Sequence, residues 1–110
     1  MNQGNILSQI PVELPDELVQ VLMQNQSVRI ERIVSRGHAS APDFWYDQSA
    51  AEWVMVVSGA ARIEFDDGTS HDLRPGDWID IPAHCRHRVA WTDPANDTVW
   101  MAVHYSGGSQ

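Results

Sequence analysis

Short apolar segments separated by turn residues run from residue 27 to residue 105, and this pattern restricts the possible folds more than any other feature. The segments are rich in β-branched and aromatic residues and are interrupted by Gly, Pro and Asp, as in strands joined by tight turns. They are SVRIERIVS (27–35), EWVMVVSG (52–59), ARIEFDDG (61–68), TSHDLRPGDWIDIP (69–82), HRVAWT (87–92) and TVWMAVHY (98–105). Many short strands with regular turns predict an all-β sandwich or small barrel.

The N-terminal segment LPDELVQVLMQN (14–25) is predicted to form the only helix. Pro15 suits the first helical turn, and the acidic residues Asp16 and Glu17 complement the helix dipole. An apolar stripe with helical spacing follows, formed by Leu18, Val19, Leu22 and Met23. We therefore expect three parts, namely an N-terminal extension with a helix (1–26), a β-domain (27–105) and a disordered tail (106–110).

Composition and charge narrow the possible partners and compartment. The 110 residues carry fifteen acidic and seven basic side chains, all seven of them Arg, so the net charge is −8. This charge repels phosphate backbones and anionic membranes, so we expect neither nucleic acid nor a membrane as partner. The single cysteine and the absence of a basic, apolar leader predict a cytoplasmic protein. The longest apolar run, WVMVV, is too short to span a bilayer.

Two spaced motifs carry the chemistry. Glu52 is followed after six residues by Gly59. Downstream, Gly76 is followed after five residues by Pro82, and His87 comes five residues later. These spacings match the two motifs of the cupin family, with His84 where the second motif has its second glycine. Over residues 28–105 the sequence resembles a small single-domain cupin.

The resemblance implies a cupin jelly-roll β-barrel, here with a short N-terminal α-helix, and a ligand cavity at one end. Cupins commonly hold a divalent metal with two His and a Glu of the first motif and one His of the second. This chain lacks the His pair of the first motif. The two positions hold Tyr46 and Gln48, or Trp45 and Asp47 if the spacer is one residue longer.

The metal set that the resemblance leaves is Gln48, Glu52 and His87, with Asp47 as a stronger alternative to Gln48. Such a mixed oxygen and nitrogen set suits a divalent transition metal, namely Fe, Mn, Ni or Zn, rather than Mg. If the metal has been lost with the two histidines, the chain is instead a metal-free ligand sensor or a structural dimeric module. Glu52 then needs another partner.

Strand alternation supports an inward-facing Glu52. If Val54 and Val56 face the interior, Glu52 does too, because alternate residues share a face. A carboxylate inside an apolar barrel is unfavourable unless a cation or hydrogen bonds compensate it. The available partners are a metal, His87 or an arginine such as Arg32.

Other side chains are candidates for a ligand pocket around this set: Tyr46, Asp47, His84, Trp91 and His104. Trp91 shares the face of His87 if the strand alternates regularly. His84 and Cys85 have an ordinary alternative, in which His84 ends a turn in solvent and Cys85 is a small buried apolar residue. Sequence neighbours on a strand point to opposite faces, which argues against a Cys85–His84 nucleophile.

Two functions remain open at this level. One is a cupin that binds a small polar or aromatic metabolite, with metal-dependent oxygenase, isomerase or lyase chemistry if it is an enzyme. The other is the metal-free binding or structural module. We also expect a homodimer, because SVRIERIVS (27–35) is predicted to lie at the edge of a sheet, where unpaired backbone groups invite a partner.

Overall fold

The computed structural model describes residues 1–106 and is all-β, as the sequence predicts. It contains eight strands: β1 (Leu18–Gln24), β2 (Val28–Ser35), β3 (Ala51–Ser58), β4 (Ala61–Phe65), β5 (Ser70–Leu73), β6 (Trp78–Ile81), β7 (His87–Thr92) and β8 (Thr98–Tyr105). The tail that was predicted to be disordered lies outside the described residues from 107 onward. None of residues 1–106 forms a helix long and apolar enough to cross a membrane.

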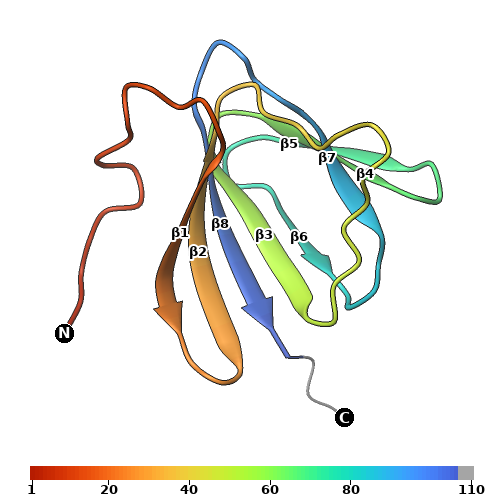
Figure 1. Cartoon of the computed structure of the whole chain (residues 1–110), viewed down its shortest axis with the longest axis horizontal. Helices are drawn as coiled ribbons and strands as arrows, with labels where there is room; N and C mark the ends of the chain where they lie inside the picture. Colours follow the sequence, from red (N-terminus) through yellow and green to blue (C-terminus); the bar gives the residue numbers. More distant parts are fainter. Residues whose placement is uncertain (107–110) are drawn as a thin grey trace.

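The strands form two sheets that together make the predicted jelly roll (Figure 1). The larger sheet has the order β1-β2-β8-β3-β6, and the smaller sheet has the order β5-β4-β7. Neighbouring strands pair antiparallel throughout. The second strand, β2, and the last strand, β8, pair along their whole length, so the beginning and the end of the chain's β-domain lie side by side.

The predicted helix over residues 14–25 is wrong, because this segment forms β1 and pairs with β2. A β-bulge explains the misleading pattern. Val21 lies opposite Glu31 and Met23 lies opposite Ile30, so Leu22 is an extra residue that breaks the two-residue alternation. The apolar residues on either side of the bulge thereby mimic helical spacing, and the sheet begins at β1 rather than at residue 27.

The expected sheet edge also changes. β2 lies between β1 and β8, so the segment 27–35 is internal, and β1 and β6 are the edges of the larger sheet. The turn between β3 and β4 requires Gly59, which has a φ of +89°. A Cβ at this position would lie 2.5 Å from the Cα of Thr98, so no larger residue fits there.

The core lies between the two sheets. It is formed by Val54, Val56, Ala61, Ile63, Leu73, Ile81, Trp100 and Ala102, all of them nearly inaccessible to solvent. Their alternation along β3 and β8 fixes which side chains face the interior. The next inward positions on these two strands are Glu52 and His104, so the apolar core gives way to ionisable groups at one end of the barrel.

Candidate functional site

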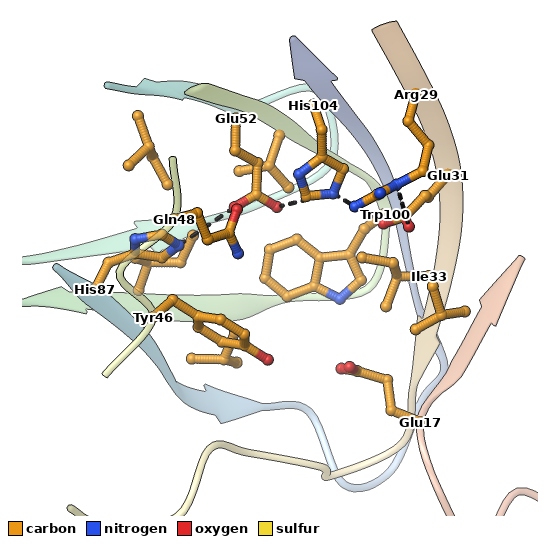
Figure 2. Close-up of a pocket in the computed structure, with 15 residues that line it drawn as sticks. Glu17, Arg29, Glu31, Ile33, Tyr46, Gln48, Glu52, His87, Trp100 and His104 are labelled. Atoms are coloured by element: carbon orange, nitrogen blue, oxygen red, sulfur yellow. Dashed lines mark hydrogen bonds and ion pairs between the residues drawn. The ribbon is translucent and has the colours of Figure 1, made fainter. Parts of the chain in front are cut away.

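A cavity of about 240 Å³ opens at this end of the barrel (Figure 2). Its apolar lining comes from the core side, with Val54, Ile63, Ile81, Val89 and Trp100. Its polar lining consists of Glu17, Arg29, Glu31, Tyr46, Gln48, Glu52, His87 and His104. A pocket with apolar and aromatic walls and a few converging polar groups is the usual form of a small-molecule site.

Strand register brings the ionisable groups together. Glu52 on β3 lies opposite His104 on β8, so both side chains project from the same face of the larger sheet. On β2, Arg29 lies opposite His104 and Glu31 lies opposite Ala102, which puts both of them on that face as well. His87 enters the cavity from β7 of the smaller sheet.

The segment before β3 supplies Tyr46 and Gln48. The backbone N–H of Tyr46 donates to the His87 carbonyl at 2.7 Å, and the His87 N–H donates to the Tyr46 carbonyl at 3.2 Å. The N–H of His84 donates to the Gln48 carbonyl at 2.7 Å. This short ladder holds the segment against the second motif, and the Tyr46 ring stacks on the His87 ring at a centroid distance of 5.4 Å.

The ionisable groups form a continuous chain across the cavity (Figure 2). His87 Nε2 lies 3.3 Å from Glu52 Oε1, and the other Glu52 oxygen lies 3.9 Å from His104 Nε2. His104 Nε2 lies 2.9 Å from Glu31 Oε1, and Glu31 Oε2 lies 3.0 Å from Arg29 Nε. Glu52 therefore has His87 as its partner, one of the alternatives that the sequence left open.

The protonation of His87 follows from its two contacts. Its Nδ1 lies 2.9 Å from the Cys85 carbonyl, which can only accept, so Nδ1 carries a proton. Burial alone lowers the pKa of His87, but the hydrogen bonds to Glu52 and to the Cys85 carbonyl, with the charge of Glu52, raise it above its usual value. The pair is thus a buried imidazolium and carboxylate over a wider pH range than for an exposed histidine.

Tyr46 replaces one of the two family histidines. Burial raises the pKa of its phenol, and the negative charges of Glu17 and Glu52 raise it further. The phenol therefore stays protonated and neutral at ordinary pH, and it would have to lose that proton to coordinate a cation strongly.

The residues at the family's metal positions do not fit a divalent metal centre as the side chains lie. Among residues 1–106, no three His, Cys, Asp or Glu side chains are arranged to hold an ion. Tyr46 offers a neutral phenol and Gln48 a carboxamide in place of two imidazoles, while Glu52 pairs with His87. The set Gln48, Glu52 and His87 does converge on the cavity, but the arrangement favours ion pairing over metal coordination.

Asp47 and His84 lie outside the cavity lining. Their side chains are largely exposed and pair with each other, with His84 Nδ1 2.8 Å from Asp47 Oδ1. His84 has a φ of +60°, which explains why the family motif has glycine at this position. Cys85 is a partly buried residue packed against the core, which matches its ordinary alternative.

Trp91 also lies outside the cavity lining, contrary to the sequence expectation. Trp91 pairs with Arg62 and Val89 pairs with Ile63, so Ala90 is an extra residue on β7. This bulge turns Trp91 to the outer face, where 41% of it is exposed, while Val89 still faces the cavity. Arg32 also faces outward, bonding Gln20 and the N-terminal arm rather than Glu52.

Four polar or aromatic residues of the cavity lining were not among the candidates from sequence: Glu17, Arg29, Glu31 and Trp100. The sequence contained a signal for two of them. Arg29, Glu31 and Ile33 are spaced two residues apart, so they share one face of β2. Charged residues on the same face as buried apolar ones mark a site. Glu17 belongs to no motif, and it reaches the cavity because it immediately precedes β1, which pairs with β2.

Comparison with known proteins agrees with this architecture. A protein from Ralstonia eutropha JMP134, provisionally named a mannose-6-phosphate isomerase, is 52% identical with a TM-score of 0.94, over 97% of this chain and 100% of that one. A cupin superfamily protein from Desulfitobacterium hafniense DCB-2 is 20% identical with a TM-score of 0.77, over 97% and 94%.

An RmlC-like cupin with a double-stranded β-helix fold from Methanocaldococcus jannaschii is 15% identical with a TM-score of 0.68, over 89% of this chain and 87% of that one. A search of curated protein sequences finds no significant match. The profile of the family described as Cupin domain matches residues 31–104, from Glu31 on β2 to His104 on β8. The chain therefore belongs to the cupin family.

Proposed function

We propose that the barrel cavity binds a small polar or aromatic metabolite without a metal, and that Glu52 and His87 transfer protons to and from it. The observation that carries this proposal is the buried Glu52–His87 pair, 3.3 Å apart, at the point where an apolar cavity begins. An acid and a base held together beside a bound molecule are the minimum requirement for proton-transfer chemistry.

The reaction class that this pair supports best is isomerisation of a hydroxy-carbonyl compound. The Glu52 carboxylate takes the proton from the carbon beside the carbonyl, and the His87 imidazolium donates a proton to the carbonyl oxygen. The enediol then returns a hydroxyl proton to His87, and Glu52 delivers its proton to the neighbouring carbon. No proton or electron is gained or lost overall, so this chemistry needs no redox cofactor.

The name of the Ralstonia protein supports the isomerase class more than the phosphorylated substrate. The cavity lining contains three carboxylates and one guanidinium, and that guanidinium, Arg29, is paired with Glu31. A phosphate dianion is repelled by this excess of carboxylates. A neutral hydroxy-carbonyl ligand is not repelled in this way. The single cysteine supports a reducing, cytoplasmic setting for the reaction.

Solvent exchange tests this function directly. Small aldoses and ketoses are incubated with the protein in D₂O, and ¹H NMR follows deuterium incorporation at the carbon beside the carbonyl. We expect exchange with the parent protein and a loss of about 100-fold or more in Glu52→Gln and in His87→Asn. His71→Asn, which changes an exposed histidine outside the cavity, is the matched control and should retain the parent rate.

Equal exchange by the parent, Glu52→Gln and protein-free solution would contradict the proposal. Metal analysis of protein purified without an affinity tag tests its metal-free part, and we expect less than stoichiometric metal. Stoichiometric Fe, Mn, Ni or Zn that is lost in His87→Ala and kept in Cys85→Ser would contradict the metal-free proposal and support a metal site formed by Gln48, Glu52 and His87.

We also propose that the protein is a homodimer through the outer face of the larger sheet. Strand register aligns apolar side chains on that face: Ile30, Trp53, Met55, Trp78, Met101 and Val103. Trp78 is 59% exposed and stacks on Trp53, with ring centroids 6.0 Å apart. Aromatic residues and methionine on an exposed sheet face are typical of an interface, and a second copy offers the same apolar surface.

Light scattering of two tryptophan variants tests this interface. Trp78→Glu is expected to raise the dissociation constant of the dimer by about 100-fold or more, because it inserts a charge into the apolar contact. Trp91→Glu changes an exposed tryptophan of the other sheet and should leave the dimer intact. A monomeric parent at millimolar concentration, or equal loss in both variants, would contradict this interface.

A further inference from the structure

The carboxylates of the cavity differ in their partners. Glu52 pairs with His87, and Glu31 pairs with both His104 and Arg29. Over residues 1–106, Glu17 forms no ion pair, and its one side-chain hydrogen bond is accepted from the neutral Ser35 hydroxyl at 2.8 Å. Glu17 is thus the one cavity carboxylate of the described chain whose charge no basic side chain offsets.

Glu17 is held in position from two directions. The Trp100 indole N–H donates to Ser35 Oγ at 3.2 Å, and Ser35 in turn donates to Glu17 Oε2, so one carboxylate oxygen is fixed by two fully buried side chains. The other oxygen, Oε1, has no hydrogen bond within residues 1–106. Glu17 is therefore a pre-oriented acceptor with one free oxygen.

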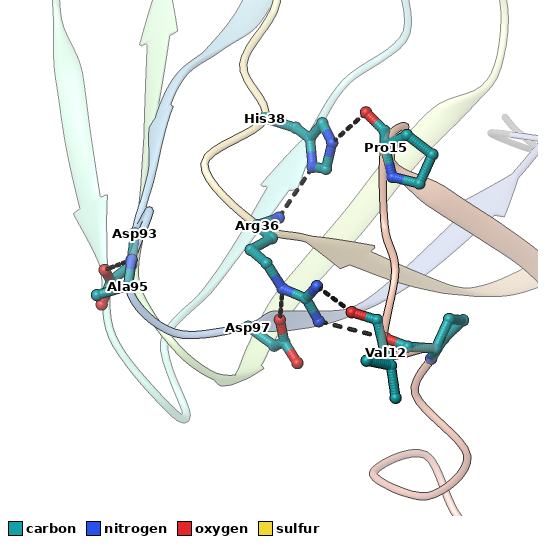
Figure 3. Close-up of polar contacts among 8 residues, drawn as sticks. Val12, Pro15, Arg36, His38, Asp93, Ala95 and Asp97 are labelled. Carbon is teal, nitrogen blue, oxygen red and sulfur yellow. Dashed lines mark hydrogen bonds and ion pairs between the residues drawn. The ribbon is translucent and has the colours of Figure 1, made fainter.

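The arm that precedes Glu17 is anchored to the barrel (Figure 3). His38 Nδ1 accepts the N–H of Arg36, so the proton on Nε2 is the one donated to the Pro15 carbonyl at 3.0 Å. Arg36 bonds the Val12 carbonyl at 2.8 Å and Asp97 at 2.6 Å. These contacts fix the chain two residues before Glu17, and they leave no ring nitrogen of His38 available to neutralise it.

Two aromatic side chains, Tyr46 and Trp100, line the cavity together with Glu17. Figure 2 shows the Tyr46 hydroxyl and the Glu17 carboxylate facing each other across the open part of the cavity, with the Trp100 ring between them and the Glu52 end. Burial raises the pKa of Tyr46 and the charge of Glu17 raises it further, which agrees with this proximity. An organic cation gains from a carboxylate and from aromatic faces alike.

We propose that Glu17, Tyr46 and Trp100 form a subsite for a cationic group, so that the ligand is an amine-bearing compound whose other end reaches Glu52 and His87. This inference rests on the proposed function, because both assign the ligand to the same cavity. An ammonium group offsets the unpaired charge of Glu17, a hydroxyl does so only in part, and a phosphate is repelled by it. The negative charge of the whole chain favours the approach of the same class of ligand.

A series of matched ligands with different charge tests the subsite by calorimetry. Mannosamine, mannose and mannose 6-phosphate share a ring, and 2-phenylethylamine and 2-phenylethanol provide the same contrast on an aromatic ring. We expect each amine to bind about tenfold or more tightly than its alcohol, and the phosphate to bind more weakly than mannose. Glu17→Gln should reduce the amine advantage to about threefold or less while neutral ligands keep their affinity within about twofold.

Glu13→Gln removes an exposed carboxylate of the same arm and is the matched control, which should keep the full amine advantage. Glu17→Asp should restore part of it, because the charge is kept while the reach is shortened. Neutral ligands that bind well without any advantage for the amines would overturn this inference alone. A failure of all five ligands to bind would overturn the proposed function and this inference together.

Discussion

The two ends of the barrel interior differ sharply although the same strands build both. On β3, Val56 and Val54 face the core and Glu52, two residues further along the same face, faces the cavity. On β8 the same change occurs from Ala102 to His104. The core end depends on close packing of apolar side chains, whereas the cavity end depends on ion pairs that must stay mutually compensated.

The largest expected effect lies at the core end. Leu73 on β5 is 3% exposed, belongs to the core and does not line the cavity. Leu73→Ala should lower the free energy of unfolding by about 2–5 kcal/mol, from lost apolar burial and the space left behind. Urea denaturation measures this, and ligand affinity of the folded fraction should stay unchanged. A loss of affinity with stability intact would show that the two ends are not separable.

The sequence predicted the core end well because periodicity reports burial. The strand segments after residue 27 and the inward alternation of Val54 and Val56 follow from spacing, and the resemblance to the cupin motifs adds the positions Glu52 and His87. The Gly residues that interrupt the segments include Gly59 and Gly68, both of which have a positive φ in turns. Local rules were sufficient for these features.

Two of the errors share one physical cause, the β-bulge. One extra residue at Leu22 made β1 resemble a helix, and one at Ala90 moved Trp91 to the outer face. A bulge shifts every following side chain by one face, and it depends on pairing between strands far apart in sequence. Glu17 was missed because its place in the cavity depends on the pairing of β1 with β2 rather than on any local motif.

The second largest expected effect is on stability at the cavity end, and unlike the effect at the core end it depends on pH. The folded pKa of His87 is raised, so the Glu52–His87 pair stabilises the fold fully below the unfolded value of about 6.5 and this stabilisation is lost as the pH rises through the folded pKa. Glu52→Gln should therefore cost about 1–3 kcal/mol near pH 6 and clearly less near pH 9.

Denaturation of the parent and of Glu52→Gln at matched pH values checks this, because their difference cancels the histidines that do not contact Glu52. Leu73→Ala serves as the control, since a core cavity has no titrating group and its cost should not vary with pH. A Glu52→Gln cost that is constant across this range, or that grows toward high pH, would mean that the carboxylate does not hold an imidazolium and that the cavity end is stabilised in another way.

The smallest expected effect concerns a residue at the rim of the cavity end, where the chain departs from the family pattern. His84 has a φ of +60°, a conformation that is unfavourable for a side chain bearing a Cβ and free of penalty for glycine. The exposed ion pair between His84 and Asp47 offsets this backbone strain in part, and such exposed pairs contribute less than about 1 kcal/mol to the free energy of unfolding.

His84→Gly removes the strain and the pair together, so we expect a change in unfolding free energy within about 1 kcal/mol, on the stabilising side if backbone strain exceeds the exposed pair. His84→Ala keeps the strain and loses the pair, so it should be less stable than His84→Gly. Thermal denaturation of both variants measures the order. The reverse order would show that glycine relieves no backbone strain at this position, and ligand binding that falls in both variants alike would extend the functional cavity to this rim.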